Sequence, residues 1–179
     1  MHLKNHSLMR NKLKQLITEY KDFPKKGILF KDLFPLLQHP DVFADLIDNM
    51  SSSEIFKDSD AIISIDARGF IFGTAISIKL SKPMIVARKP GKLPGDLLTK
   101  SYELEYGNNS LSIQKRALEK YQSFVIVDDL LATGGTATCV ANILKGAGKE
   151  IKGLSVVAEL SQLNAKDLFP FPVKSEISF

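Results

Sequence analysis

The sequence predicts an α/β protein built on a doubly wound, mainly parallel sheet. Short apolar strands alternate with helical segments along most of the chain, an order typical of a parallel sheet with helices on both faces. Glycine-rich or charged segments follow the expected strands at 66–73, 88–95 and 128–136. In an open parallel sheet, ligands bind outside the carboxyl ends of the strands, so we expect the functional site at that edge.

The first elements are predicted from apolar spacing and from proline and glycine. Leu13, Leu16, Ile17 and Tyr20 have helical spacing, so we expect a helix over 3–20, followed by a Pro- and Gly-rich loop over 23–34. Pro40 is well placed to begin the next helix. The later elements expected are a helix over 41–50, a strand over 61–65, a helix over 70–80, a strand over 83–87, a strand through 124–127, a helix over 136–146 and a strand over 154–158.

The segment 88–107 is rich in Lys, Gly and Pro and has little core content. Long loops of this kind are usually functional lids or disordered, and we expect a lid loop over about 88–110. Within it, 101–105 and 110–113 are expected to pair as a hairpin across 107–109. The end of the chain, 167–179, is expected to pack as an edge or tail.

The length of 179 residues suits one domain with a full core, and 44% hydrophobic with 25% charged residues is an ordinary globular composition. No apolar run has the length of a membrane span, and the polar N-terminus lacks a signal peptide's hydrophobic region. The single cysteine, Cys139, excludes an intrachain disulfide and fits a reducing compartment. We therefore expect a cytoplasmic protein with no membrane partner.

The net charge is +4, from 24 basic and 20 acidic residues, and basic residues are concentrated before residue 32. A run of this kind can signal nucleic acid, but no aromatic residues are interleaved for base stacking. A solvated helix face is the favoured interpretation, and no nucleic-acid partner is expected. His2, His6, His39 and Cys139 share no metal-ligand spacing, so no structural zinc site is expected.

The most informative segment is 124–136. An apolar strand is expected to end at two adjacent carboxylates, Asp128 and Asp129, and a loop of small hydroxyl and glycine residues leads into a helix. Backbone N–H groups in such a loop at a helix N-terminus attract phosphate. The two acids can accept hydrogen bonds from ribose hydroxyls or coordinate a hard cation. A purely structural strand–turn–helix unit is the alternative.

This segment resembles the signature of the type I phosphoribosyltransferases. Three further segments, 66–73, 88–95 and 101–107, look like the adenine-specific branch of that family, and 22–32 is similar to its base-binding segment. The resemblance implies that Asp128 and Asp129 bind the ribose hydroxyls, directly or through Mg²⁺. The residues implied to hold the 5′-phosphate are Ala132, Thr133, Gly134, Gly135 and Thr136.

The resemblance implies pyrophosphate-binding roles for Arg68, Arg88, Lys89 and Lys92. The loop around Arg68 often carries a non-proline cis peptide bond in the family, and an ion pair of purely structural importance is the alternative role for this arginine. Arg88 is implied to reach the pyrophosphate of a neighbouring subunit, which implies a homodimer. From the sequence alone, 88–92 is a solvated charged loop.

The resemblance also implies the base site. Leu29, Phe30 and Lys31 would form a hood over the base, with Lys31 standing where the family more often has Arg, and Leu130 and Leu160 match positions near the base. The implied catalytic residues are Glu105, Arg68 and Tyr106. Glu103 is the rival carboxylate for Glu105, and an exposed strand glutamate is the structural alternative.

We therefore expect a single phosphoribosyltransferase domain over 1–179, with an N-terminal helix and base-binding hood over about 1–35 and a core over about 36–179. The implied reaction converts adenine and 5-phosphoribosyl 1-pyrophosphate to AMP and pyrophosphate in purine salvage. Mg²⁺ is implied as the cofactor, held by the substrate without direct protein ligands and reaching Asp128 or Asp129 through water. Another base is one alternative, and the other is a non-catalytic regulator that senses the phosphoribosyl donor and binds nucleic acid.

Overall fold

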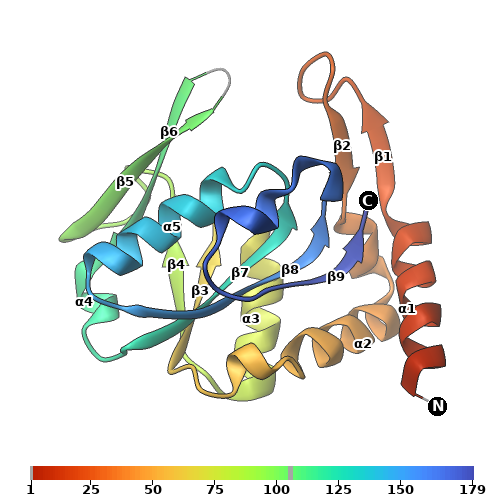
Figure 1. The fold of residues 1–179 in the computed structure, drawn as a ribbon, viewed down its shortest axis with the longest axis horizontal. Coiled ribbons are helices and arrows are strands. Elements are labelled where there is room, and N and C mark those ends of the chain that lie inside the picture. Colours follow the sequence, from red (N-terminus) through yellow and green to blue (C-terminus); the bar gives the residue numbers. More distant parts are fainter. Residues whose placement is uncertain (1, 105–106) are drawn as a thin grey trace. The chain divides into compact units, whose positions relative to one another are not determined.

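The computed structural model describes residues 2–104 and 107–179 (Figure 1). The chain forms two compact units, Met1–Asn49 and Met50–Phe179. The first unit contains α1 (His2–Leu16), β1 (Thr18–Lys21), β2 (Leu29–Asp32), the 3-10 turn η1 (Phe34–Gln38) and most of α2 (Pro40–Ser51). No helix in the described part of the chain is long and apolar enough to cross a membrane.

In the first unit, the predicted helix over 3–20 is wrong beyond Leu16. Residues Thr18–Lys21 form β1 and pair antiparallel with β2, with Glu19 opposite Lys31. Thr18 and Tyr20 are good strand formers, and cross-strand pairing outweighs the helical spacing of the apolar residues before them. The predicted loop over 23–34 therefore contains a strand. In the turn between the strands, the Gly27 N–H donates to Asp22 Oδ1 at 2.6 Å.

The second unit is built on a five-stranded parallel sheet of order β4-β3-β7-β8-β9. Its elements are the 3-10 turn η2 (Glu54–Phe56), β3 (Ala61–Ile65), α3 (Gly69–Leu80), β4 (Met84–Ala87), β5 (Leu97–Leu104), β6 (Gly107–Gln114), α4 (Lys115–Leu118), β7 (Ser123–Leu131), α5 (Gly135–Gly146), β8 (Glu150–Glu159), the 3-10 turns η3 (Ser161–Leu163) and η4 (Ala165–Leu168), and β9 (Val173–Ser178). The predicted doubly wound α/β fold is confirmed.

Alternate residues of the central strands face opposite helices, as the strand period of two requires. Ile63, Ile126 and Val156 belong to one core cluster with the buried face of α5. Ser64 faces α3, and a Cβ added to Gly73 of α3 would lie 2.3 Å from Ser64 Oγ. Glycine at 73 therefore lets this helix pack directly on the strand that carries the site loop, and Figure 1 shows α3 and α5 on opposite sides of the sheet.

Other differences from the predicted elements concern strand lengths. β7 does not stop before the two acids: it runs to Leu131, so Asp128 and Asp129 lie within the strand. Strands β5 and β6 pair antiparallel, but Leu104 is opposite Gly107 and Tyr102 is opposite Asn109, so the 107–109 segment predicted as the turn lies within β6. β5 also begins at Leu97, inside the segment expected to be irregular. The C-terminal segment supplies β9, which is an edge strand as expected.

Candidate active site at the carboxyl edge of the sheet

The strand order reverses between β3 and β7. From β3 the chain proceeds through α3 to β4 on one side, whereas β7, β8 and β9 follow on the other side. In doubly wound folds, this reversal opens a crevice at the carboxyl ends of the two strands. The loop after β3 carries Arg68, and the end of β7 carries Asp128 and Asp129. The topology therefore brings two of the motifs that the sequence singled out to one place.

Arg68 and Asp129 form an ion pair across this reversal point, with Arg68 Nε 2.8 Å from Asp129 Oδ2. The contact is ionic, since this oxygen has no well-aligned hydrogen-bond donor. The Asp129 side chain is only 6% exposed, while that of Arg68 is 25% exposed. Burial raises the pKa of Asp129, and the guanidinium charge acts in the opposite direction. Arg68 thus partly compensates a carboxylate that the fold removes from water.

Asp128 is buried beside Asp129 and accepts a hydrogen bond at Oδ1 from the Asp129 backbone N–H at 2.9 Å. Burial and then the neighbouring Asp129 charge hold the pKa of Asp128 well above its ordinary range. A Cβ on Gly69 would lie 2.9 Å from Asp128 Oδ1. A glycine after Arg68 is therefore what lets the loop approach the acids this closely.

A second ion pair joins the loops after β3 and β4. Arg88 Nε lies 3.0 Å from Asp66 Oδ2, and the Arg88 guanidinium carbon is 5.8 Å from the centre of the Phe70 ring. The peptide bond between Asp66 and Ala67 is cis, as the resemblance implied for this loop. Lys89 and Lys92 are exposed on the loop after β4. Arg68 and Arg88 thus both make ion pairs at strand ends.

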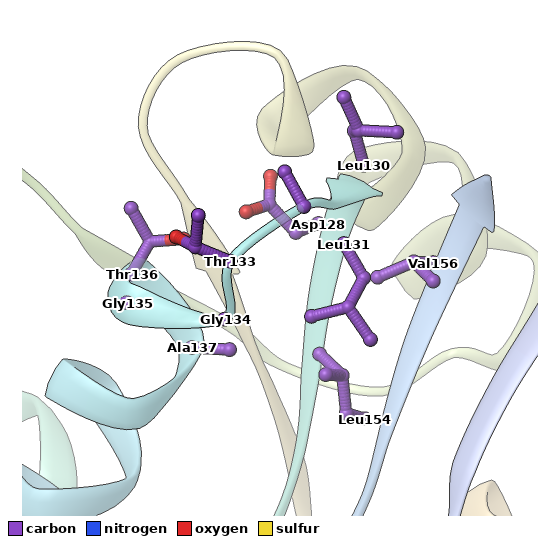
Figure 2. Close-up of a pocket in the computed structure, with 11 residues that line it drawn as sticks. Asp128, Leu130, Leu131, Thr133, Gly134, Gly135, Thr136, Ala137, Leu154 and Val156 are labelled. Atoms are coloured by element: carbon purple, nitrogen blue, oxygen red, sulfur yellow. The ribbon is translucent and has the colours of Figure 1, made fainter. Parts of the chain in front are cut away.

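The segment 132–136 forms one wall of a cavity of about 260 Å³ (Figure 2). Gly134 has a φ of 82°, a left-handed conformation that favours glycine, and its carbonyl accepts the Thr138 N–H at 2.9 Å as α5 begins. In Figure 2, Asp128, Thr133 and Thr136 lie toward one side of the cavity, and Leu131, Leu154 and Val156 lie toward the other. The cavity therefore has a polar end beside the N-terminus of a helix, where an anion is favoured.

The residues predicted for the base are not all brought to this cavity. Leu130 lines it, whereas Leu160 lines a second cavity of about 190 Å³ with Glu159, Ser161 and Lys166. Leu29, Phe30 and Lys31 lie on β2 in the first unit, where Lys31 is buried and paired with Glu19. Glu105 and Tyr106 lie outside the described residues. Within the second unit, the structure therefore brings the predicted phosphate residues together with Asp128, and it places Leu130 and Leu160 on different cavities.

Cys139 lies on the buried face of α5. It is 1% exposed, and its thiol donates to the Lys100 carbonyl at 3.1 Å. Burial raises the pKa of this thiol, which opposes formation of a thiolate. Cys139 is therefore a core residue of α5.

Comparison with known proteins gives the family. The chain matches the phosphoribosyl transferase domain family over residues 36–177. It is 73% identical over 172 residues to the adenine phosphoribosyltransferase of Prochlorococcus marinus strain MIT 9211, covering 96% of this chain and 100% of that protein. The chain belongs to the adenine phosphoribosyltransferase family. A relative of that name from Mycoplasmopsis agalactiae is 48% identical over 155 residues, covering 87% of this chain and 90% of that protein.

Solved structures agree with this family membership. Adenine phosphoribosyltransferase from Thermoanaerobacter pseudethanolicus superposes with a TM-score of 0.89 at 40% identity, covering 94% of this chain and 99% of that one. The Saccharomyces cerevisiae adenine phosphoribosyltransferase, crystallised with adenine and an imino-altritol bisphosphate, gives a TM-score of 0.88 at 33% identity, covering 95% and 99%. The type I phosphoribosyltransferase fold predicted from the sequence is therefore confirmed.

Sequence reasoning missed several residues of this phosphoribosyltransferase site. Asp66 was not assigned a role, although an acid so near Arg68 at a strand end was a usable signal. Leu131, Leu154 and Val156 line the cavity but are indistinguishable in sequence from core residues. Ala165 and Leu168, in the segment after β8, lie close to Gly134 of the phosphate loop, and no sequence motif identifies them.

Proposed function

We propose that the chain transfers the 5-phosphoribosyl group of 5-phosphoribosyl 1-pyrophosphate to N9 of adenine, giving AMP and pyrophosphate for purine salvage. The observation that carries the proposal is the cavity in which Asp128 and the 132–136 loop meet at the N-terminus of α5. The names of the relatives support it, as does the adenine bound by the Saccharomyces cerevisiae protein. In the reaction, the bond from C1 of ribose to pyrophosphate breaks, the N9–C1 bond forms, and the N9 proton leaves.

The 5′-phosphate would bind at the loop 132–136. Gly134 and Gly135 leave the backbone open to close approach, Thr133 and Thr136 add hydroxyl donors, and the helix dipole favours negative charge. This arrangement fixes one end of the donor. Positioning of this kind lowers the barrier by removing freedom before the chemical step.

The ribose would lie along Asp128 and Asp129, whose carboxylates accept hydrogen bonds from its 2′- and 3′-hydroxyls. Both side chains are buried, so these bonds form where water competes little. Two new hydroxyl donors would also favour the ionised form of acids whose pKa burial raises. Binding of the donor would then relieve an unfavourable electrostatic arrangement in the protein.

Mg²⁺ is proposed as the cofactor, carried by the donor's pyrophosphate. Asp128 and Asp129 fit it, because adjacent carboxylates offer the oxygen ligands that Mg²⁺ prefers, and they would reach it through water. Bound there, the cation supplies positive charge to the leaving pyrophosphate. Arg68, Arg88, Lys89 and Lys92 provide the same kind of stabilisation from the protein, where charge grows in the transition state.

The base would be held by the hood residues Leu29, Phe30 and Lys31 together with Leu130 and Leu160. Apolar side chains pack on the flat ring, and backbone groups can read its edge. We propose that Glu105 receives the N9 proton and that Tyr106 helps to close the lid over the reacting bond. Exclusion of water matters here, because an activated ribosyl centre otherwise hydrolyses.

We also propose a homodimer in which Arg88 acts on the pyrophosphate of the neighbouring subunit. The resemblance supports this role, and in its own chain Arg88 contacts Asp66. Mixing inactive Arg88→Ala and Asp129→Ala chains tests it. One site of a mixed dimer would then have both residues intact, so activity returns if Arg88 acts between subunits and stays absent if it acts within its own chain.

A cytoplasmic location is part of the proposal, and the presence of a single cysteine, Cys139, supports it. Fractionation of cells with an antibody against the chain tests the compartment. Recovery in the membrane or secreted fraction would contradict it.

An end-point assay tests the proposed reaction directly. The phosphoribosyl donor and Mg²⁺ are incubated with adenine, hypoxanthine, guanine, xanthine or orotate in separate tubes, and nucleotides are resolved by chromatography. AMP from adenine alone is expected, and chelation of Mg²⁺ should abolish it. Another nucleotide would mean that the base assignment is wrong. Donor binding without any product would identify the chain as a sensor.

A further inference from the structure

The phosphate loop rests on the short turn η4 (Ala165–Leu168). A Cβ added to Gly134 would lie 3.0 Å from Leu168 Cδ1 and 3.5 Å from Ala165 Cβ. Ala165 is 4% exposed and belongs to the same core cluster as the buried face of α5. The backbone of Gly134 therefore lies against η4 without space between them, and a shift of η4 would be transmitted to the loop.

Lys166 attaches η4 to the sheet. Its ammonium lies 2.7 Å from the Glu159 carboxylate, the last residue of β8, and donates to Ser175 Oγ of β9 at 3.2 Å. The Glu159 side chain is 11% exposed, so most of its solvation is replaced by this contact. Ion pairs between two exposed side chains contribute little to stability. An ion pair with one buried partner, such as Glu159, holds the position of its two side chains more firmly.

Backbone hydrogen bonds join the end of β8 to the ends of both neighbouring strands. The Phe179 N–H donates to the Glu159 carbonyl at 2.9 Å, and the Leu160 N–H donates to the Leu131 carbonyl at 2.9 Å. Leu131 is the last residue of β7, immediately before the phosphate loop. Lys166 thus connects η4 to β8 and β9. The end of β8 is in turn hydrogen-bonded to the end of β7, where the phosphate loop begins.

A turn between η3 and η4 directs the chain back under the loop. Asn164 adopts the left-handed conformation, with φ 48° and ψ 29°, which asparagine tolerates better than most residues. Because η4 is only four residues long, it has few side chains that could attach it to the rest of the unit. The side-chain anchor at Lys166 is therefore the main polar connection between η4 and the sheet among the described contacts.

We propose that Lys166 is a positioning residue for the 5′-phosphate site. Its pairing with Glu159 holds η4 in place, and η4 holds the Gly134 backbone where the loop N–H groups converge on the anion. The inference rests on the proposed function only for the assignment of the phosphate to the 132–136 loop. Lys166 acts through η4 and does not itself contact the phosphate.

The test compares Lys166→Met with Lys166→Arg and with the control Lys152→Met. Lys152 pairs with Glu150 at 2.6 Å near the opposite end of β8, so the control also removes one ion pair from that strand. The readouts are the Kd of ribose 5-phosphate by calorimetry, the KM values for donor and adenine, and thermal unfolding. For Lys166→Met we expect about a tenfold weaker Kd and higher donor KM, with the adenine KM unchanged.

Lys166→Arg should restore most of the phosphate affinity, because it keeps the charge, and Lys152→Met should match the wild type. An unchanged Kd in Lys166→Met would overturn the inference. So would an equal rise of both KM values, which indicates general loosening of the fold. Calorimetry needs no turnover, so wild-type protein that binds ribose 5-phosphate but makes no AMP would contradict the proposed function while leaving this test valid.

Discussion

Arg68 Nε lies 2.8 Å from Asp129 Oδ2 across the reversal point of the sheet. The residue proposed to hold pyrophosphate is therefore paired with a residue proposed to hold ribose. Binding of the donor would offer each partner a replacement: phosphate oxygens for the guanidinium and hydroxyl donors for the carboxylate. The ion pair thus keeps two buried or half-buried charges compensated and leaves both available to the substrate.

Removing either partner of this pair should abolish most activity. For Arg68→Ala and Asp129→Ala we expect kcat to fall by about 100-fold or more, because each removes a group that acts on charge or position in the transition state. Circular dichroism should show that both variants remain folded. Steady-state kinetics with adenine and donor measures the effect.

Lys57→Ala is the matched control, since Lys57 forms an exposed ion pair with Glu54 at 3.3 Å. Its activity and melting temperature should equal those of the wild type. Wild-type turnover in Arg68→Ala or Asp129→Ala would remove both residues from the mechanism.

The buried Asp128 should make the protein less stable as the pH rises. Burial raises the pKa of Asp128, with the Asp129 charge adding to the effect, so the folded state retains a proton that the unfolded chain loses near the ordinary Asp range. The stability contributed by Asp128 is therefore full at low pH and is lost as the pH passes its raised pKa. The melting temperature of Asp128→Asn should lie above that of the wild type at pH 8, and the difference between the two melting temperatures should shrink toward pH 4.

Asp60→Ala provides a control of opposite sign. The backbone N–H groups of Gln122 and Ser123 lower the pKa of Asp60, so its contribution is present at neutral pH and is lost as the pH falls through the lowered value. Its melting temperature should lie below the wild type at pH 8 and approach it in acid. Parallel curves for wild type and Asp128→Asn would disprove the assigned titration.

The core of this fold was predictable because its strands are continuous apolar runs. The strand over 61–65 and the helices at 41–50 and 70–80 agree with β3, α2 and α3 to within about one residue. β7 was predicted too short, because Asp128 and Asp129 look like a strand end. The ion pair of Asp129 with Arg68 was not visible in the sequence, because the pairing of β3 with β7 is what brings these two residues together.

The hood hairpin was missed for a different reason. Lys31 and Glu19 face each other across β1 and β2, and two charged residues at these positions give no alternating apolar pattern. The role of η4 was equally hidden, because the contact of Leu168 with Gly134 depends on the left-handed turn at Asn164. Such features follow from tertiary contacts and carry no local signal in the sequence.

Gly134→Ala should weaken the donor site and the fold together. An alanine at φ 82° is strained by about 1–2 kcal/mol, and its Cβ would also press on Leu168 Cδ1 at 3.0 Å. We expect a lower free energy of unfolding by urea titration and a higher donor KM. In Gly146→Ala, at the other end of α5, no atom lies within 4 Å of the new Cβ. The free energy of unfolding of this variant should therefore rise by about 0.4–1 kcal/mol. Equal stability of the two variants would contradict this account.

The Lys31–Glu19 pair should control base affinity through the shape of the hood. Lys31 is 5% exposed and its ammonium contacts Glu19 directly across the hairpin, so its charge stabilises the hairpin that carries Leu29 and Phe30. For Glu19→Gln we expect the adenine KM to rise by about tenfold, the cost of one charge-assisted contact, with the donor KM unchanged. Lys31→Arg should retain wild-type kinetics, because a guanidinium can make the same pair, and Lys21→Met, on the exposed end of β1, should have no effect.

A donor KM that rises with the adenine KM would show that the pair maintains the fold as a whole. An unchanged adenine KM in Glu19→Gln would mean that the hood holds its shape without the pair.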